Sequence, residues 1–180
     1  TIDTARITVS AGATLGGSGT ITGDTDVNGT LSTGSSAAAG SVGDLTFSGV
    51  ATDLTFSVGS LWLVDVVQGA IDNADTVAVG GTLSLGDSVF DPTFLFTGTY
   101  TLGTKYTLAT YGSLAGSFSS FADNAVYTLG GAGGGDYLFR YNDAGAITLT
   151  AVPEPGSLVI LGVVGGICYW RRRSGRVMTK

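Results

Sequence analysis

The stretch Gly29-Thr30-Leu31-Ser32-Thr33-Gly34 returns later in the chain as Gly81-Thr82-Leu83-Ser84-Leu85-Gly86. Both copies place small polar and apolar residues in alternation between glycines, which is typical of short β-strands and lacks any helical period. A single unit of this size cannot bury an apolar face, whereas stacked units bury theirs on one another. The repeat therefore predicts an all-β fold in which short strands form the rungs of a β-solenoid (β-helix).

Residues 1–44 are rich in Gly, Thr, Ser and Ala, and they carry short apolar stretches such as Ile7-Thr8-Val9 and Thr20-Ile21-Thr22. We assign this first segment to solenoid rungs or to a linker. Within it, residues 33–43 fit a loop or a disordered segment as well as they fit a rung.

Residues 45–151 have longer and more apolar strands, and we assign them to a β-rich passenger domain. In Leu61–Val67, Trp62, Val64 and Val66 alternate with the residues of the other strand face, the period-two pattern of a strand. A hinge is expected at Asp91-Pro92. Asn142-Asp143-Ala144-Gly145 predicts a hairpin turn between the last two strands.

Histidine is absent from the 180 residues, and the single cysteine is Cys168. The chain therefore lacks the usual general base and the usual nitrogen metal ligand, and no Ser-His or Cys-His nucleophile can form. One cysteine excludes an internal disulfide and a cysteine zinc site. We expect no enzyme activity in these residues and no cofactor.

The charge is divided unevenly along the chain. Residues 1–152 contain 13 Asp and no Glu against Arg6, Lys105 and Arg140, a net charge of −10, and the remainder carries +4, which together give the −6 of the whole chain. An acidic passenger does not bind nucleic acid by neutralising phosphates. It could attract divalent cations instead.

The segment 152–180 has three parts in order. Val152-Pro153-Glu154-Pro155 is followed by an uncharged run over residues 156–170, and then by Arg171-Arg172-Arg173. The two prolines favour an extended backbone before the run. As a helix, the run would span roughly 22 Å, less than the roughly 30 Å of a hydrocarbon core. We therefore expect one marginal transmembrane helix over about 156–170, with a basic, cytoplasmic C-terminal tail.

This segment resembles the PEP-CTERM sorting signal of Gram-negative bacteria, in which a Val-Pro-Glu-Pro motif, a short transmembrane helix and an Arg-rich end follow one another. The resemblance implies recognition by an exosortase, a membrane-embedded protease, with Val152, Pro153, Glu154 and Pro155 as the sorting and processing motif and Arg171, Arg172 and Arg173 as the membrane stop. It implies transient residence in the inner membrane, cleavage, and delivery to the cell surface or extracellular matrix. The same segment is also labelled an ice-binding protein C-terminal domain.

Residues 75–85 and 105–118 resemble the C-terminal ends of autotransporter-like and pectate-lyase-like β-helix passengers. This resemblance implies a β-helix that gives way to a β-sandwich-like cap. It implies no particular activity, because such scaffolds carry many functions.

Asp72, Asn73 and Asp75 form a close cluster of oxygen-bearing side chains, which hard cations such as Ca²⁺ prefer. The spacing of known calcium loops is absent, so a turn between strands is the favoured interpretation and calcium the weaker one. Asp24 and Asp26 could form a carboxylate pair for glycosidic cleavage, although both are adjacent to turns and lack supporting aromatic residues.

Two further patterns have a functional and a structural interpretation. Thr-x-Thr pairs such as Thr20/Thr22 and Thr148/Thr150 could order water on an ice-binding face, but threonine is common on any exposed strand. Tyr137, Phe139 and Tyr141 could stack on sugars, although at period two they fit the core face of a terminal hairpin better.

The leading hypothesis is an exported, non-enzymatic, β-rich structural protein of the cell surface or extracellular matrix. We expect the chain to be the C-terminal part of a longer precursor. The alternatives are the C-terminal part of a secreted polysaccharide-acting β-helix enzyme, and a carbohydrate-binding or ice-binding module. The expected partners are an exosortase, the inner membrane and, as a further candidate, an extracellular polysaccharide.

Overall fold

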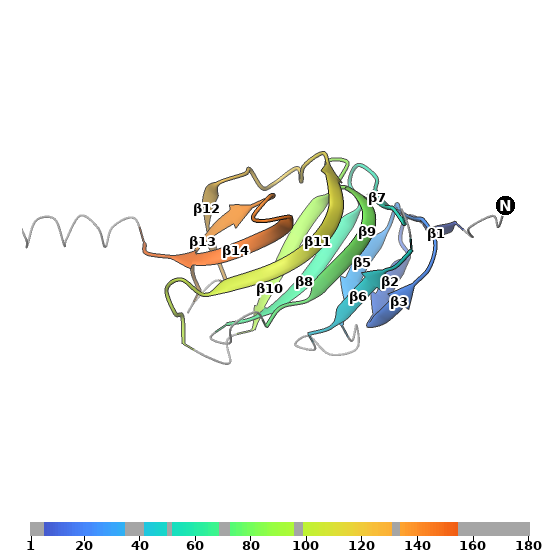
Figure 1. Cartoon of the computed structure of the whole chain (residues 1–180). Coiled ribbons are helices and arrows are strands. Elements are labelled where there is room, and N and C mark those ends of the chain that lie inside the picture. Colours follow the sequence, from blue (N-terminus) through green and yellow to red (C-terminus); the bar gives the residue numbers. More distant parts are fainter. Residues whose placement is uncertain are drawn as a thin grey trace, which may run out of the picture.

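A computed structural model describes residues 6–34, 42–49, 52–68, 73–95, 99–130 and 134–154, with the side chains of residues 94 and 95 left out. This part of the chain is all-β and contains no helix (Figure 1), which confirms that the fold is all-β as predicted. The strands are β1 (Ile7–Val9), β2 (Thr14–Gly17), β3 (Gly19–Ile21), β4 (Thr25–Val27), β5 (Thr30–Thr33), β6 (Asp44–Phe47), β7 (Leu54–Phe56), β8 (Leu61–Val67), β9 (Thr76–Ser84), β10 (Val89–Leu95), β11 (Lys105–Ala115), β12 (Ala125–Leu129), β13 (Gly135–Arg140) and β14 (Ala146–Val152).

The first ten strands form three parallel ladders that the chain visits in turn. One ladder runs β1-β4-β7 and on to the second part of β9, another runs β2-β5-β8-β10, and the third runs β3-β6 and on to the first part of β9. Each circuit of the chain therefore lies in register on the previous circuit. Pairs such as Gly19 with Leu45 join the two sides of the predicted boundary at 44/45.

The two copies of the sequence repeat do not occupy equivalent positions in these ladders. Leu31 of the first copy pairs with Trp62, whereas Leu83 of the second copy pairs with Leu54 in the other sheet. The repeat therefore does not define the register of the strands. The Gly-Thr-Leu-Ser pattern indicates only a short strand that follows a turn at a glycine. Such a strand can pair in any of the three ladders.

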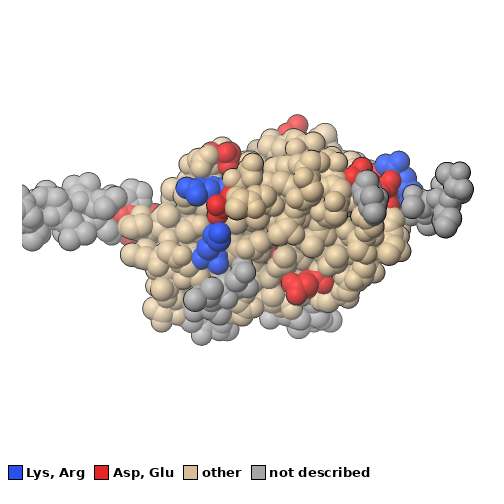
Figure 2. Space-filling model, viewed as in Figure 1, with Lys and Arg blue, Asp and Glu red and all other residues tan. Residues whose placement is uncertain are grey.

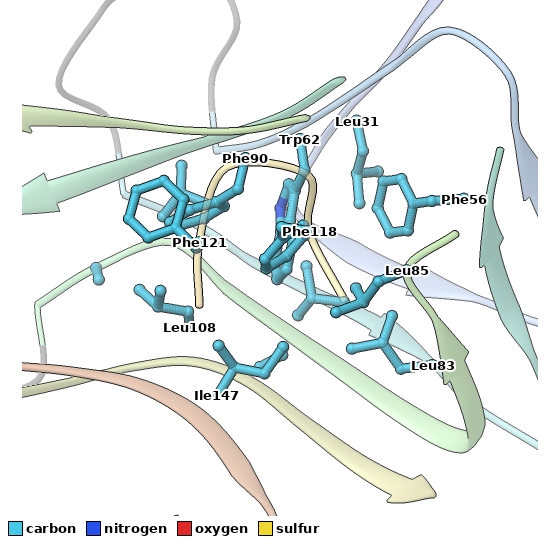
Figure 3. Close-up of a cluster of buried hydrophobic side chains, with 14 of the residues drawn as sticks. Leu31, Phe56, Trp62, Leu83, Leu85, Phe90, Leu108, Phe118, Phe121 and Ile147 are labelled. Atoms are coloured by element: carbon cyan, nitrogen blue, oxygen red, sulfur yellow. The ribbon is translucent and has the colours of Figure 1, made fainter. Parts of the chain in front are cut away.

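The side chains that point between the ladders form one apolar core. In β8, Trp62, Val64 and Val66 are buried and the alternate residues are partly exposed, which confirms the predicted alternation. Trp62 is 0% exposed, and its ring centroid lies 5.8 Å from that of Phe56 and 5.7 Å from that of Phe90 (Figure 3). Phe90 meets Trp62 edge-on at 64° because β10 pairs in register with β8, whereas Phe56, from the neighbouring ladder, stacks on Trp62 at 27°.

Asp91-Pro92 is not a hinge, contrary to the sequence prediction. Both residues lie within β10, where Pro92 pairs with Val64 of β8. Proline has no N–H to donate to a ladder and is therefore tolerated on edge strands. β10 is the last strand of its four-stranded sheet, so Pro92 occupies such an edge.

Glycines allow the chain to turn sharply where it passes from one ladder to the next. A Cβ atom added at Gly112 would lie 2.8 Å from the carbonyl oxygen of Gly80, and one added at Gly80 would lie 2.9 Å from the carbonyl oxygen of Gly49. Successive circuits thus approach each other backbone to backbone at this corner, and only glycine leaves the space that they need.

The last strands close the stack with antiparallel pairing. β11 is parallel to β9 on one side and antiparallel to β14 on the other, and β13 and β12 follow in the same sheet. The turn at residues 142–145 joins β13 to β14 as predicted, with Ala144 and Gly145 at positive φ and Gly145 N–H donating to Asn142 Oδ1 at 3.1 Å. Figure 1 shows β1 and β14 at opposite ends of the body.

Replacement of Trp62 by alanine tests whether the stacked core holds the circuits together. Truncation of a fully buried tryptophan should lower the free energy of unfolding by about 3–5 kcal/mol, because the transfer energy is lost and a cavity remains. Urea unfolding measures this change. Val58→Ala, at a residue that is 81% exposed, is the control and should change stability by less than about 0.5 kcal/mol. Equal effects of the two variants would contradict the core assignment.

Candidate functional site

The predicted sorting motif begins at the end of β14, the last strand in the described part of the chain. Val152 is the last residue of β14 and pairs with Asp136 of β13. Pro153 follows and cannot donate a backbone hydrogen bond, so the ladder stops there. Pro153 and Glu154 are exposed. Pro155, the apolar run 156–170 and Arg171–Arg173 lie outside the described residues.

The carbonyl group of Val152 is held by a tyrosine from a distant part of the chain. The Tyr100 hydroxyl lies 2.6 Å from the carbonyl oxygen of Val152 and also contacts the carbonyl oxygen of Asp136. A phenol has one proton to donate, so the two carbonyls share it. Tyr100 therefore ties together the end of β14 and the start of β13.

Backbone hydrogen bonds from residues close to Tyr100 in the sequence also hold the C-terminal end of β14. Gly103 N–H donates to the carbonyl oxygen of Ala151 at 2.8 Å, and Ala151 N–H donates to the carbonyl oxygen of Thr104 at 2.8 Å. The end of β14 is thus bonded to β13 on one side and to residues 103–104 on the other. Val152 is the last residue with a hydrogen bond to this framework before the chain leaves it.

The ring of Tyr100 fits its place because Gly135 has no side chain. A Cβ atom added at Gly135 would lie 2.2 Å from Cε2 of Tyr100. The Tyr100 ring also meets the buried ring of Tyr137 edge-on, at 5.6 Å and 89°. Burial raises the pKa of the Tyr100 hydroxyl, the charges of Asp136 and Glu154 act in the same direction, and the bonds to the two carbonyls oppose them. The hydroxyl therefore remains protonated, and able to donate, at neutral pH.

Comparison with known families identifies the segment that begins at this strand end. Residues 151–173 match the PEP-CTERM protein-sorting motif. The match starts at Ala151, so its first residues are the last of β14 and its next residues are exposed. It supports an exported protein that is sorted by an exosortase. No curated protein and no solved structure matches the chain.

None of the described residues forms a helix that is long and apolar enough to cross a membrane. The predicted helix at about 156–170 falls outside this part of the chain, and the structure does not test it.

The predicted calcium cluster is only partly described, because Asp72 lies outside the described residues. Both oxygens of the Asp75 carboxylate accept backbone hydrogen bonds, from Gly43 N–H at 2.8 Å and from Asp65 N–H at 2.9 Å. Asp75 is 1% exposed. It therefore joins the turn to two neighbouring segments. Across the described ranges, no group of three or more His, Cys, Asp or Glu side chains is placed to hold a metal ion.

Burial makes Asp75 a titrating group near neutral pH. Removal from water raises the pKa of its carboxyl to about 6, the charge of Asp65 adds to the rise, and the hydrogen bonds from Asp65, Gly43 and Thr33 oppose it. The carboxyl is therefore easier to protonate in the folded chain than in the unfolded chain, where an aspartate has its ordinary pKa of 3.8.

The free energy of unfolding should consequently rise as the pH falls from about 7 to about 4, because only the folded state takes up this proton in that window. The contribution of Asp75 should be about 3 kcal/mol, and it should be missing in Asp75→Asn. Urea unfolding of both proteins at several pH values measures it. Asp87→Asn, which removes the same charge from an exposed turn, shows the general effect of charge. An equal pH dependence of the wild type and Asp75→Asn would contradict the assignment.

Asp24 and Asp26, considered above as a glycosidic carboxylate pair, both have structural partners. The Arg6 guanidinium donates to the two oxygens of Asp26 at 2.5 and 2.7 Å, and this ion pair joins β4 to the residue directly before β1. Asp24 Oδ1 accepts the backbone N–H of Asp53 at 3.0 Å. The pair therefore joins successive circuits of the chain.

The hydrogen bond between the Asp53 N–H and Asp24 belongs to a row of polar side chains, one in each circuit, that was not predicted from the sequence. Asp53 Oδ1 accepts the backbone N–H of Thr82 at 2.7 Å, and Ser113 Oγ donates to Thr82 Oγ1 at 3.0 Å. The four residues Asp24, Asp53, Thr82 and Ser113 occupy the same corner of successive circuits. A search for an oxygen-bearing residue before each apolar strand, at spacings near 30 residues, would have found this register.

Replacement of Asp53 by alanine should lower the free energy of unfolding by about 1 kcal/mol, because the Thr82 N–H loses its acceptor. Asp53→Asn keeps an Oδ1 acceptor and is the matched control, with an expected change of only a few tenths of a kcal/mol. Chemical denaturation of the two variants measures the difference. If Asp53→Asn loses as much free energy of unfolding as Asp53→Ala, the charge of Asp53 and not its hydrogen bond to Thr82 is responsible, which would contradict the prediction.

The burial of the aromatic and threonine side chains decides between the two interpretations of each pattern. Tyr137, Phe139 and Tyr141 are 0%, 0% and 8% exposed, which confirms the core interpretation of the terminal hairpin. Thr148 is fully buried, whereas Thr20 is exposed, so these threonines do not share one face. Tyr100, which holds the motif, was missed because its contacts join positions 36 and 52 residues apart.

Proposed function

We propose that this protein is an exported, β-rich structural component of the cell surface or extracellular matrix, sorted and cleaved by an exosortase through Val152–Pro155. The single observation that carries the proposal is the PEP-CTERM match at residues 151–173, located where β14 leaves the folded body. In this proposal the run at about 156–170 resides transiently in the inner membrane as a single helix, and Arg171–Arg173 remain in the cytoplasm as its stop.

The architecture supports a structural role for the part that is exported. We infer that the in-register circuits are the last coils of a β-solenoid and that the antiparallel strands β12–β14 are its cap. Such a stack buries its apolar residues between successive coils and exposes an extended surface. The face drawn in Figure 2 carries few charged side chains, and two of the three basic residues in the described part of the chain are paired with a carboxylate, Arg6 with Asp26 and Lys105 with Asp143. The described residues therefore offer no cluster of basic side chains for nucleic acid.

We also propose that the chain is not an enzyme. The acidic residues that could have formed a catalytic pair or a metal site, Asp24, Asp26 and Asp75, hold neighbouring circuits together through the bonds described above. Their oxygens are used to accept backbone and guanidinium hydrogens. An extracellular polysaccharide remains a candidate partner of the exposed surface.

Processing is tested by producing the chain with an export signal in a host with an exosortase and in the same host without it. The wild-type product should be shortened and released from the membrane only where the exosortase is present. Replacing Pro153, Glu154 and Pro155 together by alanine should reduce the cleaved fraction at least about tenfold, because enzyme recognition depends on contacts made at the site of reaction. Intact mass and membrane fractionation give both readouts.

Glu154→Gln separates the role of the charge from that of the prolines, because it keeps the backbone and side-chain shape of the motif. Asp87→Asn removes a charge from an exposed turn outside the motif and should be cleaved like the wild type. A wild-type chain that is retained at full length in both hosts would refute the proposal.

A further inference from the structure

The geometry around Val152 also bears on where the chain can be cut, an inference that rests on the proposed processing. Cleavage of a peptide bond requires a nucleophile to reach the carbonyl carbon; the C–N bond then breaks, and the amine nitrogen leaves with a proton. A protease must therefore approach the carbonyl of the residue before the cut. The carbonyl of Val152 is already hydrogen-bonded to the Tyr100 hydroxyl at 2.6 Å.

The residues before Val152 are less accessible still. Ala151 is 3% exposed and exchanges two backbone hydrogen bonds with residues 103–104. Val152 pairs with Asp136 on the other side. An extended chain cannot enter a protease while it remains in these ladders, because the same N–H and C=O groups cannot bond to both partners.

Pro153 and Glu154, the two described residues after Val152, have none of these restraints on their backbone. Pro153 ends the ladder, and Pro153 and Glu154 are both exposed. The first peptide bond whose carbonyl lies beyond the Tyr100 contact is the bond between Pro153 and Glu154.

We propose that Tyr100 is a positioning residue that sets the N-terminal limit of cleavage. Its hydroxyl keeps the processing enzyme from the carbonyl group of the Val152–Pro153 peptide bond, and the strand that it holds in place keeps the enzyme from all earlier peptide bonds. The cut therefore falls after Pro153 or further on. The mature protein then keeps the whole of β14 and its two ladders.

The test replaces Tyr100 by phenylalanine in the full chain, which keeps the ring against Gly135 and Tyr137 and removes only the hydroxyl. Hydrogen exchange of the Ala151 amide should become about fivefold faster, the change expected for loss of one hydrogen bond of about 1 kcal/mol. In the host with the exosortase, the wild-type product should end at Pro153 or later. The Tyr100→Phe product should contain additional chains that end at Val152 or before it.

Tyr111→Phe is the matched control, because the Tyr111 hydroxyl also donates to a backbone carbonyl, that of Tyr141, at 2.7 Å. It should lose a similar amount of stability and leave both the exchange at Ala151 and the product terminus unchanged. Gly135→Ala is a second variant, because the new Cβ displaces the Tyr100 ring; it should reproduce the ragged terminus of Tyr100→Phe.

Two results would overturn the inference: a wild-type product that ends at or before Val152, or a Tyr100→Phe product with the wild-type terminus although exchange at Ala151 is faster. Unchanged exchange in Tyr100→Phe would also refute it, because the hydroxyl would then not hold the strand. These results differ from failure of the proposed function, in which the wild-type chain is not cleaved at all.

Discussion

The structure depends on in-register parallel stacking of one circuit of the chain on the next. Inward side chains of paired strands lie over one another, as Leu31, Trp62 and Phe90 do, and the strands inside each sheet satisfy their backbone groups on the strands at both sides. The chain has no disulfide to provide additional cross-links, because its single cysteine is Cys168. Burial and hydrogen bonding are therefore coupled: a residue that disturbs one inward position also disturbs the ladders on both sides.

Three of the acidic residues, Asp24, Asp53 and Asp75, take part in this stacking through hydrogen bonds to the backbone. A corner between two strands leaves N–H groups without a partner in the ladder, and a short side chain with an oxygen atom can accept them. Asp24 and Asp53 accept such groups from the next circuit, and Asp75 accepts two of them in a buried turn. The high aspartate content and the absence of glutamate before residue 153 fit this use, because the shorter side chain reaches the backbone without added freedom.

Some features could be predicted from the sequence because they are local. The alternation in Leu61–Val67, the turn at 142–145 and the tail motif each depend on residues adjacent in the chain, and for these the strand face, the turn and the motif were predicted correctly. The register could not be predicted, because the repeat at 29–34 and 81–86 fits more than one ladder. Pro92 was interpreted as a hinge because its position on a sheet edge depends on the order of strands in space.

The hold of Tyr100 on Val152 was likewise invisible in the sequence, since it requires three separate segments to meet. That meeting has a mechanical consequence for the folded body. A pull on the chain beyond Val152 acts along β14, which lies between β11 and β13. Both ladders of β14 then resist in shear, with many hydrogen bonds sharing the force at once, whereas a strand pulled away from a sheet edge would lose its bonds one after another. A force applied to the chain beyond Val152 is therefore borne by both neighbours of β14 together.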